Sequence, residues 1–320
     1  MEEHKAPVTQ SFADQVRAAP GGDHLDLCFS CGTCVSKCLI QQKKEPEYNP
    51  RRLLRMVMMD MREETYQSPT TWLCSACDLC YPACPQEIHI SSLIGAVKTL
   101  ALEAGYSSPL ETVSVDESLC SGCAICVMSC PYGAPHLINK EVNGEMDRFS
   151  EVDANLCMGC GVCVAACPMG AIARPGVANA DILPQVKIKS KKDVPSLVVF
   201  ICDWSLRSVE DEALLESYPT NVRVIHIPCS GRIDPQLALY ALSSGIDGVL
   251  VFGCQPGECH YKRGTYVSEC KISLLDKMLG QMEVNEGRVR FVRIGTQDWG
   301  RVRNEIDQML KDLAMIKEVH

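Results

Sequence analysis

The chain has 320 residues, a formal net charge of −9 and 21 cysteines. So acidic a chain argues against nucleic acid as a partner, and no apolar run approaches the ~20 residues of a transmembrane segment. A disulfide scaffold is disfavoured, because that class comprises short secreted chains, whereas residues 1–20 are charged and lack the apolar core of a signal peptide. We therefore expect a cytoplasmic protein of two or three domains whose cysteines bind metal.

The first domain, residues 1–109, is predicted to be helical and to carry two cysteine runs. A short helix is expected around Phe12–Ala18, another within RRLLRMVMMDM, whose apolar residues follow helical spacing, and a third from about Ser91 to Ala104. The runs CFSCGTCVSKC and WLCSACDLCYPACP contain Cys28, Cys31, Cys34, Cys38, Cys74, Cys77, Cys80 and Cys84. Pro85 follows the second run, but Leu39 stands where proline would follow the first.

A repeat forms the second domain, residues 110–178. VDESLCSGCAICVMSCPYGA recurs 37 positions later as VDANLCMGCGVCVAACPMGA. Each copy is the C-x₂-C-x₂-C-x₃-C-P run of ferredoxins that hold two 4Fe–4S clusters. The copies contain Cys120, Cys123, Cys126 and Cys130, then Cys157, Cys160, Cys163 and Cys167. Short strands are expected between them at His136–Asn139 and Arg148–Val152.

In such pairs the fourth cysteine of a run ligates the other cluster, so we assign the ligands crosswise. The four 4Fe–4S sets are Cys28, Cys31, Cys34 with Cys84; Cys74, Cys77, Cys80 with Cys38; Cys120, Cys123, Cys126 with Cys167; and Cys157, Cys160, Cys163 with Cys130.

After a predicted linker at 179–193, ending in the basic segment KIKSKKD, strands and helices alternate through residues 194–320. This pattern predicts an α/β domain with a parallel sheet. The expected strands are Leu197–Ile201, Val222–Ile227, Gly248–Phe252 and Val289–Ile294. The expected helices are Asp211–Glu216, Pro235–Ser243, Val267–Leu279 and Trp299–Met315. The predicted fold class is thus multidomain α+β.

Four cysteines follow the first three of these strands: Cys202, Cys229, Cys254 and Cys259. Because parallel strands end at one edge of their sheet, we expect the four thiols to meet there. Four thiolates suit a 2Fe–2S cluster, which we favour, or a structural zinc; separate buried cysteines are a third interpretation. Cys270 is a reserve ligand if Cys202 fails.

Three other side chains lie near this predicted site in the sequence. We expect His260 to bond to the backbone or to line a contact surface rather than to ligate metal. Arg232 and Arg263 flank the site, either offsetting cluster charge or as ordinary exposed charges.

Three stretches resemble components of heterodisulfide reductase complexes. FADQVRAAPGGDHLDLCFSCGTCVSKC with WLCSACDLCYPACP resembles the small iron–sulfur protein HdrC, and the central repeat is similar to the ferredoxin part of HdrA. CDW, PCSGRID and GVLVFGCQPGECHY resemble the delta subunit of methyl-viologen-reducing hydrogenase (MvhD), which carries a 2Fe–2S cluster. That family usually has a second cysteine after the tryptophan, and here Ser205 occupies the position.

The resemblance implies a fused electron-relay subunit with four 4Fe–4S clusters, one 2Fe–2S cluster and about 18 iron atoms. The implied partners are an HdrA-like flavoprotein, an HdrB-like catalytic subunit and a donor: a hydrogenase, a formate dehydrogenase or an NADH-oxidising flavoprotein. A stand-alone reductase is the alternative, but the chain has neither the G-x-G-x-x-G dinucleotide fingerprint nor a Cys-Cys pair. A scaffold folded around metal is a third hypothesis.

Overall fold

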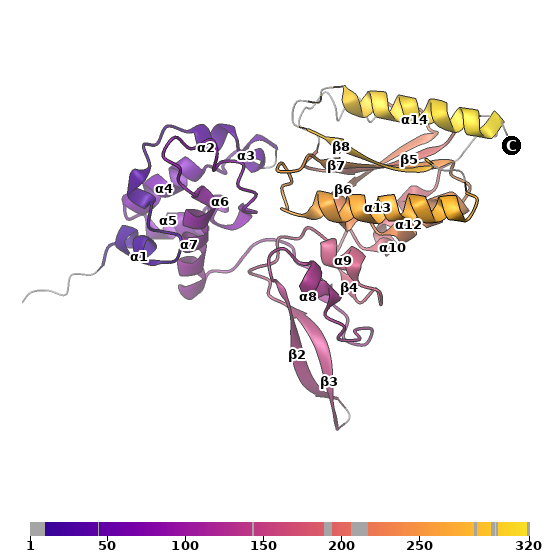
Figure 1. The fold of residues 1–320 in the computed structure, drawn as a ribbon. Helices are drawn as coiled ribbons and strands as arrows, with labels where there is room; N and C mark the ends of the chain where they lie inside the picture. Colours follow the sequence, from indigo (N-terminus) through magenta and orange to yellow (C-terminus); the bar gives the residue numbers. More distant parts are fainter. Residues whose placement is uncertain are drawn as a thin grey trace, which may run out of the picture. The chain divides into compact units, whose positions relative to one another are not determined.

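The computed structural model describes residues 10–43, 45–142, 144–188, 194–205, 217–284, 287–295, 298 and 300–318. The chain divides into two compact units, Met1–Leu110 and Glu111–His320. Figure 1 shows the first unit as helices and loops, and the second as a small two-cluster domain followed by a sheet covered by helices.

The first unit is built of short helices. They are α1 (Phe12–Ala18), η1 (Leu25–Leu27), α2 (Thr33–Ser36), α3 (Leu39–Lys43), α4 (Pro50–Met58), α5 (Arg62–Gln67), α6 (Pro69–Leu73) and α7 (Ile90–Glu103). Local sequence explains where several begin: Ser11 and Asn49 accept hydrogen bonds from the first turns of α1 and α4, and Pro50 opens α4. The predicted helical character of this unit is confirmed.

One apolar core holds these helices together. It combines Phe12 of α1, Leu54 of α4 and Val97 of α7, all with no exposed surface. Cys34 belongs to the same core, and Cys28, Cys74, Cys80 and Cys84 pack against it. The thiols are therefore anchored by the packing of the unit and not carried on free loops.

The first part of the second unit is the predicted two-cluster domain. Strand β1 (Ser114–Val115) pairs antiparallel with β4 (Ile172–Ala173), and β2 (Pro135–Val142) forms a hairpin with β3 (Glu145–Val152). The hairpin is longer than the two strand-like pieces expected from the sequence. Each cysteine run leads into one short helix, α8 (Ile125–Ser129) or α9 (Val162–Ala166).

The remainder of the second unit is the predicted parallel sheet. Strands β5 (Leu197–Cys202), β6 (Val222–Ile227), β7 (Gly248–Cys254) and β8 (Val289–Ile294) lie in the order β6-β5-β7-β8, and all pair in parallel. Helices α12 (Pro235–Ser243) and α13 (Gly264–Gln281) cover one face, and α14 (Arg301–Glu318) covers the other (Figure 1). A sheet covered on both faces explains why its two central strands, β5 and β7, are buried and apolar along their length.

The structure differs from the prediction at residues 179–186. Pro184 and the basic segment that follows indicate a linker, but these residues form helix α10 (Asn179–Val186). Ile182 and Val186 lie one helical turn apart and are both buried against the sheet's core. Residues 189–193, like the predicted helix at 211–216, lie outside the described residues.

Helix α7 offers a test of the first unit. Gly95 lies on its exposed side, where an added methyl group would meet no atom within 4 Å. Gly95→Ala should stabilise α7 by about 1 kcal/mol, because alanine loses less backbone entropy in a helix. Amide hydrogen exchange in α7 should slow by about fivefold; faster exchange would contradict the assigned position.

Candidate metal centres

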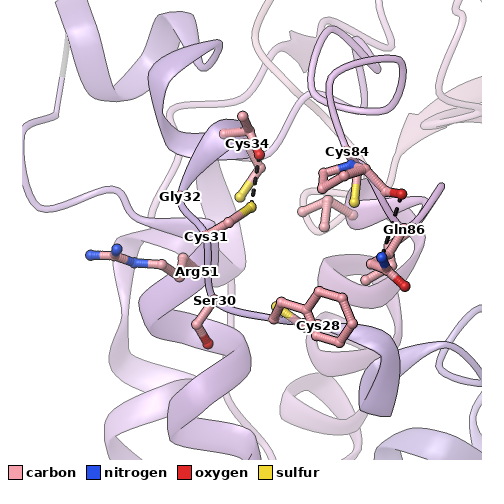
Figure 2. A pocket seen from close by; sticks show the side chains of 13 residues that line it. Cys28, Ser30, Cys31, Gly32, Cys34, Arg51, Cys84 and Gln86 are labelled. Carbon is pink, nitrogen blue, oxygen red and sulfur yellow. Dashed lines mark hydrogen bonds between the residues drawn. The ribbon is translucent and has the colours of Figure 1, made fainter.

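The first pocket brings together four cysteines from two runs. Figure 2 shows Cys28, Cys31 and Cys34 on one side of a common space and Cys84 on the other. The space has an empty volume of about 340 Å³ and is otherwise lined partly by Phe29, Arg51, Ile88 and Ile90. Gly32, with φ +89°, turns the chain between the ligands so that α2 can begin. The four thiols are those assigned to one cluster by the crosswise rule.

A second pocket in the same unit has Cys74, Cys77 and Cys80 on its wall, together with Cys38, in a space of about 360 Å³. Burial raises the pKa of Cys38 to about 11 and raises that of Cys80 further. The buried hydroxyl of Tyr48 is hydrogen-bonded to Cys74 and lowers that thiol's pKa, against the larger opposite effect of burial. A metal cation in the pocket would reverse this balance, since it stabilises thiolates directly.

The third set lies in the two-cluster domain. Cys120, Cys123, Cys126 and Cys167 line a space of about 320 Å³. The Ser150 amide donates to Cys120 Sγ at 3.5 Å, an N–H···S contact of the kind that orients ligand thiolates. Each of the three pockets thus has on its wall three cysteines of one run and the fourth of its partner run, and Cys34 also reaches the second pocket. Four thiols per pocket are the donor set that a 4Fe–4S cluster needs.

The glycine of this loop is required by packing. Gly122 has φ +60°, and a Cβ there would lie 2.3 Å from the carbonyl oxygen of Arg148. Only glycine therefore allows the ligand loop to lie directly against β3.

The fourth set is the most enclosed of the 4Fe–4S sets, since Cys157, Cys160 and Cys163 are all buried. Burial raises the pKa of Cys163, and the neighbouring Cys160, Cys157 and Cys130 thiolates raise it further. Cys130 and Cys126 of the other run therefore both lie close enough to act on this loop, and the crosswise assignment of Cys130 stays a prediction.

The C-terminal cysteines meet at the carboxyl edge of the sheet. Cys202 and Cys254 end β5 and β7, Cys229 follows β6, and Cys259 lies in the loop after β7. All four are buried and in mutual contact. Hydrogen bonds from Cys229 and Cys254 lower the pKa of both Cys202 and Cys259. Four converging sulfurs are the donor set of the 2Fe–2S cluster that was favoured from the sequence.

Aromatic and polar side chains from the same loops lie beside these thiols. Trp204 stacks on buried His260 at 3.5 Å between ring centroids, with Tyr261 packed edge-on against both. The Ser205 hydroxyl lies 3.8 Å from Cys254 Sγ. His260 is thus buried between Trp204 and Tyr261, next to Cys259 in the chain, contacts that its position in the sequence did not reveal.

Burial distinguishes the two interpretations that the sequence left open for Arg232 and Arg263. Arg263 is exposed, whereas Arg232 is fully buried, so for Arg232 the interpretation as an ordinary exposed charge is wrong. Cys270 is exposed on α13, away from the four-thiol group that already includes Cys202.

Two kinds of feature are absent from the described residues. No group of three or more His, Cys, Asp or Glu side chains there is arranged to hold a single metal ion. Among the same residues, no helix is long and apolar enough to cross a bilayer.

Family models match three parts of the chain. The model described as methyl-viologen-reducing hydrogenase, delta subunit, matches residues 197–317. Models of the 4Fe–4S dicluster domain match residues 24–88 and 119–172.

Three relatives each match a part of the chain. The A subunit of the ferredoxin:CoB-CoM heterodisulfide reductase of Methanosarcina mazei is 36% identical over 241 residues, which are 72% of this chain and 29% of that protein. The D iron–sulfur subunit of the F420-non-reducing hydrogenase of Archaeoglobus profundus is 37% identical over 128 residues, 38% of this chain and 93% of that protein. The C subunit of the H(2):CoB-CoM heterodisulfide,ferredoxin reductase of Methanothermobacter marburgensis is 30% identical over 105 residues, 33% of this chain and 55% of that protein. The first of these matches spans less than a third of the Methanosarcina protein's own length.

Double substitutions test the crosswise sets. If Cys28 and Cys84 bind one cluster, Cys28→Ser with Cys84→Ser should lose about as much iron as Cys28→Ser alone. Cys28→Ser with Cys38→Ser should lose about twice as much, because two clusters are damaged. Iron per chain after anaerobic purification measures both. Equal losses in the two double variants would refute the assignment.

The C-terminal pocket is tested at Gly264. A Cβ at this position would lie 2.1 Å from Cys229 Sγ, so Gly264→Ala must displace the thiol. We expect the variant to lose only this site's metal, about 2 of the ~18 iron atoms. Gly95→Ala, which meets open space, is the matched control. Full metal content in Gly264→Ala would show that Cys229 is not a ligand.

Proposed function

Because the chain belongs to the methyl-viologen-reducing hydrogenase delta subunit family through residues 197–317, joined to two 4Fe–4S dicluster domains, we propose that it relays electrons within a heterodisulfide reductase-like complex. It would hold four 4Fe–4S clusters in the crosswise cysteine sets and one 2Fe–2S cluster on Cys202, Cys229, Cys254 and Cys259. Each cluster, when bound, accepts and donates a single electron.

The observation that carries this proposal is the proximity of two ligand loops in the second unit. Burial raises the pKa of Tyr132, and the thiolates of Cys160, Cys229 and Cys259 raise it further. Cys160 belongs to the two-cluster domain, whereas Cys229 and Cys259 belong to the sheet domain. One tyrosine thus lies near ligands of both sites. Electron tunnelling weakens steeply with distance, so neighbouring ligand loops are what a relay needs.

Backbone packing brings the same two loops together. A Cβ on Gly231, two residues after Cys229, would lie 2.9 Å from a methyl group of Val162 in the other loop. The Lys271 ammonium, from α13, donates to the carbonyl oxygens of Ala165 at 3.3 Å and Ile233 at 3.4 Å. The fit of these surfaces supports a fixed spacing between the fourth 4Fe–4S set and the C-terminal site.

The exposure of the predicted ligands supports two different roles, internal electron transfer for the covered sites and partner contact for the exposed ones. The C-terminal thiols and the three loop thiols of the fourth set are covered, whereas Cys31 and Cys123 are exposed. Exposed apolar side chains accompany both, Phe29 beside Cys31 and Met128 in the helix that follows Cys123. These edges suit contact with a redox partner, since a docked protein would exclude water from the exposed ligand.

The identities of the partners extend the proposal. We propose that electrons enter at the C-terminal site from a hydrogenase, a formate dehydrogenase or an NADH-oxidising flavoprotein, and leave through the first unit. The receiving modules would be an HdrA-like flavoprotein and an HdrB-like catalytic subunit. In this arrangement the chain has no substrate site of its own, so the isolated chain should not turn over NADH or a disulfide.

The C-terminal cluster is tested by one substitution. Cys254→Ser should abolish the 2Fe–2S EPR signal of the anaerobically reduced full chain and spare the 4Fe–4S signals, because the thiols that Cys254 contacts are those of the C-terminal set. Cys270→Ser, in the same domain but exposed, should retain every signal.

Other outcomes would overturn parts of the proposal. An unchanged 2Fe–2S signal in Cys254→Ser would refute the ligand set. About 16 iron atoms with one zinc in the unsubstituted chain would assign the last site to structural zinc. Turnover of NADH or a disulfide by the isolated chain would favour the stand-alone reductase.

A further inference from the structure

Arg232 is the largest side chain of the described residues among those with essentially no exposed surface. It ends the 3₁₀ turn η2 (Ser230–Arg232), directly after the ligand Cys229. Its Nε donates to the carbonyl oxygen of Val177, and its Nη2 donates to Asn179 Oδ1 at 2.7 Å. The third nitrogen, Nη1, is buried and has no hydrogen-bond partner among the described residues.

A buried guanidinium with an unpaired N–H group is costly, since both the charge and the donor have lost their water. The nearest carboxylates are used elsewhere: Asp234 caps α12 and accepts from Asn179, and Asp181 accepts from the Ala178 amide. Burial lowers the pKa of Arg232 only to about 10, so the side chain is still cationic at neutral pH. A further anionic acceptor is therefore missing from the surroundings of Nη1.

The side chain lies against the loop of the fourth 4Fe–4S set. A Cβ on Gly161 would lie 2.9 Å from Arg232 Cδ, so the arginine stem packs directly on the backbone between Cys160 and Cys163. The Cys163 thiolate is among the negative charges that act on Arg232. Sulfur of this site is thus the acceptor that the surroundings of Arg232 offer beyond these two carboxylates.

The internal repeat supplies an independent observation. The position 37 residues before Gly161 is Ala124, and both residues begin the helix after their loop with positive φ, +78° and +65°. The first copy therefore tolerates a methyl group at the position where the second has none. The methyl group is absent in the copy where Arg232 occupies its space.

We propose that Arg232 donates from Nη1 to a sulfur atom of the cluster held by Cys157, Cys160, Cys163 and Cys130, and that it raises the reduction potential of this cluster above that of the sister cluster. The inference rests on the proposed clusters. Reduction adds one negative charge to a cluster, and a buried cation that donates an N–H···S bond stabilises that charge. Within the central pair, the cluster nearer the C-terminal site is then the one that is reduced first.

The test is an EPR-monitored redox titration of the full chain, purified anaerobically, with the signal of this cluster identified by its loss in Cys160→Ser. Arg232→Gln should lower the equilibrium constant for reduction of this cluster at least tenfold, a shift of about 59 mV for one electron. Iron content and the other 4Fe–4S potentials should stay unchanged. Arg232→Lys, which keeps the charge, should recover part of the shift.

Matched variants separate charge from packing. Gly161→Ala, which pushes the guanidinium away, should lower the same potential, whereas Ala124→Gly in the sister loop should not. Arg263→Gln, at an exposed arginine of the same domain, should leave all potentials in place. If Arg232→Gln loses iron through misfolding, Gly161→Ala and Arg232→Lys carry the test.

Two results would overturn the inference: an unchanged potential in iron-replete Arg232→Gln, or a shift confined to the C-terminal site. Absence of 4Fe–4S signals from the unsubstituted chain would instead refute the relay itself, so the two failures are distinguishable.

Discussion

The structure depends on cysteine thiols from separate loops that meet in buried, apolar surroundings. In the first unit, the cysteines of the core lie within or against a single apolar cluster. Burial opposes ionisation there, as the raised pKa of Cys34, about 11, shows. A metal cluster removes this conflict, because the iron atoms stabilise thiolate and tie the loops together at once. Metal binding and folding are therefore expected to be one equilibrium in this unit.

The second unit also brings buried thiols together from separate loops, and here a β-sheet positions some of these loops. Its apolar strands need no metal to pack, since helices cover both faces. What the sheet contributes is position: the carboxyl ends of β5, β6 and β7 place three ligand loops at one edge. The same edge contacts the loop of Cys157–Cys163, and Arg232 lies where the two meet. The sheet thus fixes the spacing between the Cys157–Cys163 loop and the four C-terminal thiols.

Much of this arrangement could be predicted from the sequence. The strand pattern located β6 and β8 at their observed bounds. The ferredoxin rule grouped cysteines that line common pockets, although Cys34 lines two of them. Both signals are local or follow from one chemical rule. Helix α10 was missed because Pro184 and nearby lysines masked two apolar residues that face the sheet.

Arg232 was missed for a different reason. Its burial depends on a contact between Gly231, Gly161 and Val162, which are distant in sequence. Charge pattern alone cannot distinguish an exposed arginine from one enclosed by a second domain. One signal was present in the chain: the replacement of alanine by glycine between the two copies of the repeat, at positions 124 and 161.

Mössbauer spectroscopy of the full chain, enriched in ⁵⁷Fe and titrated anaerobically with reductant, tests the central claim most directly. The account predicts that about eight-ninths of the iron belongs to 4Fe–4S clusters and the remainder to one 2Fe–2S cluster, and that about five electrons reduce each chain. A spectrum without a 2Fe–2S component, or uptake of clearly fewer electrons by iron-replete protein, would contradict the five-centre relay.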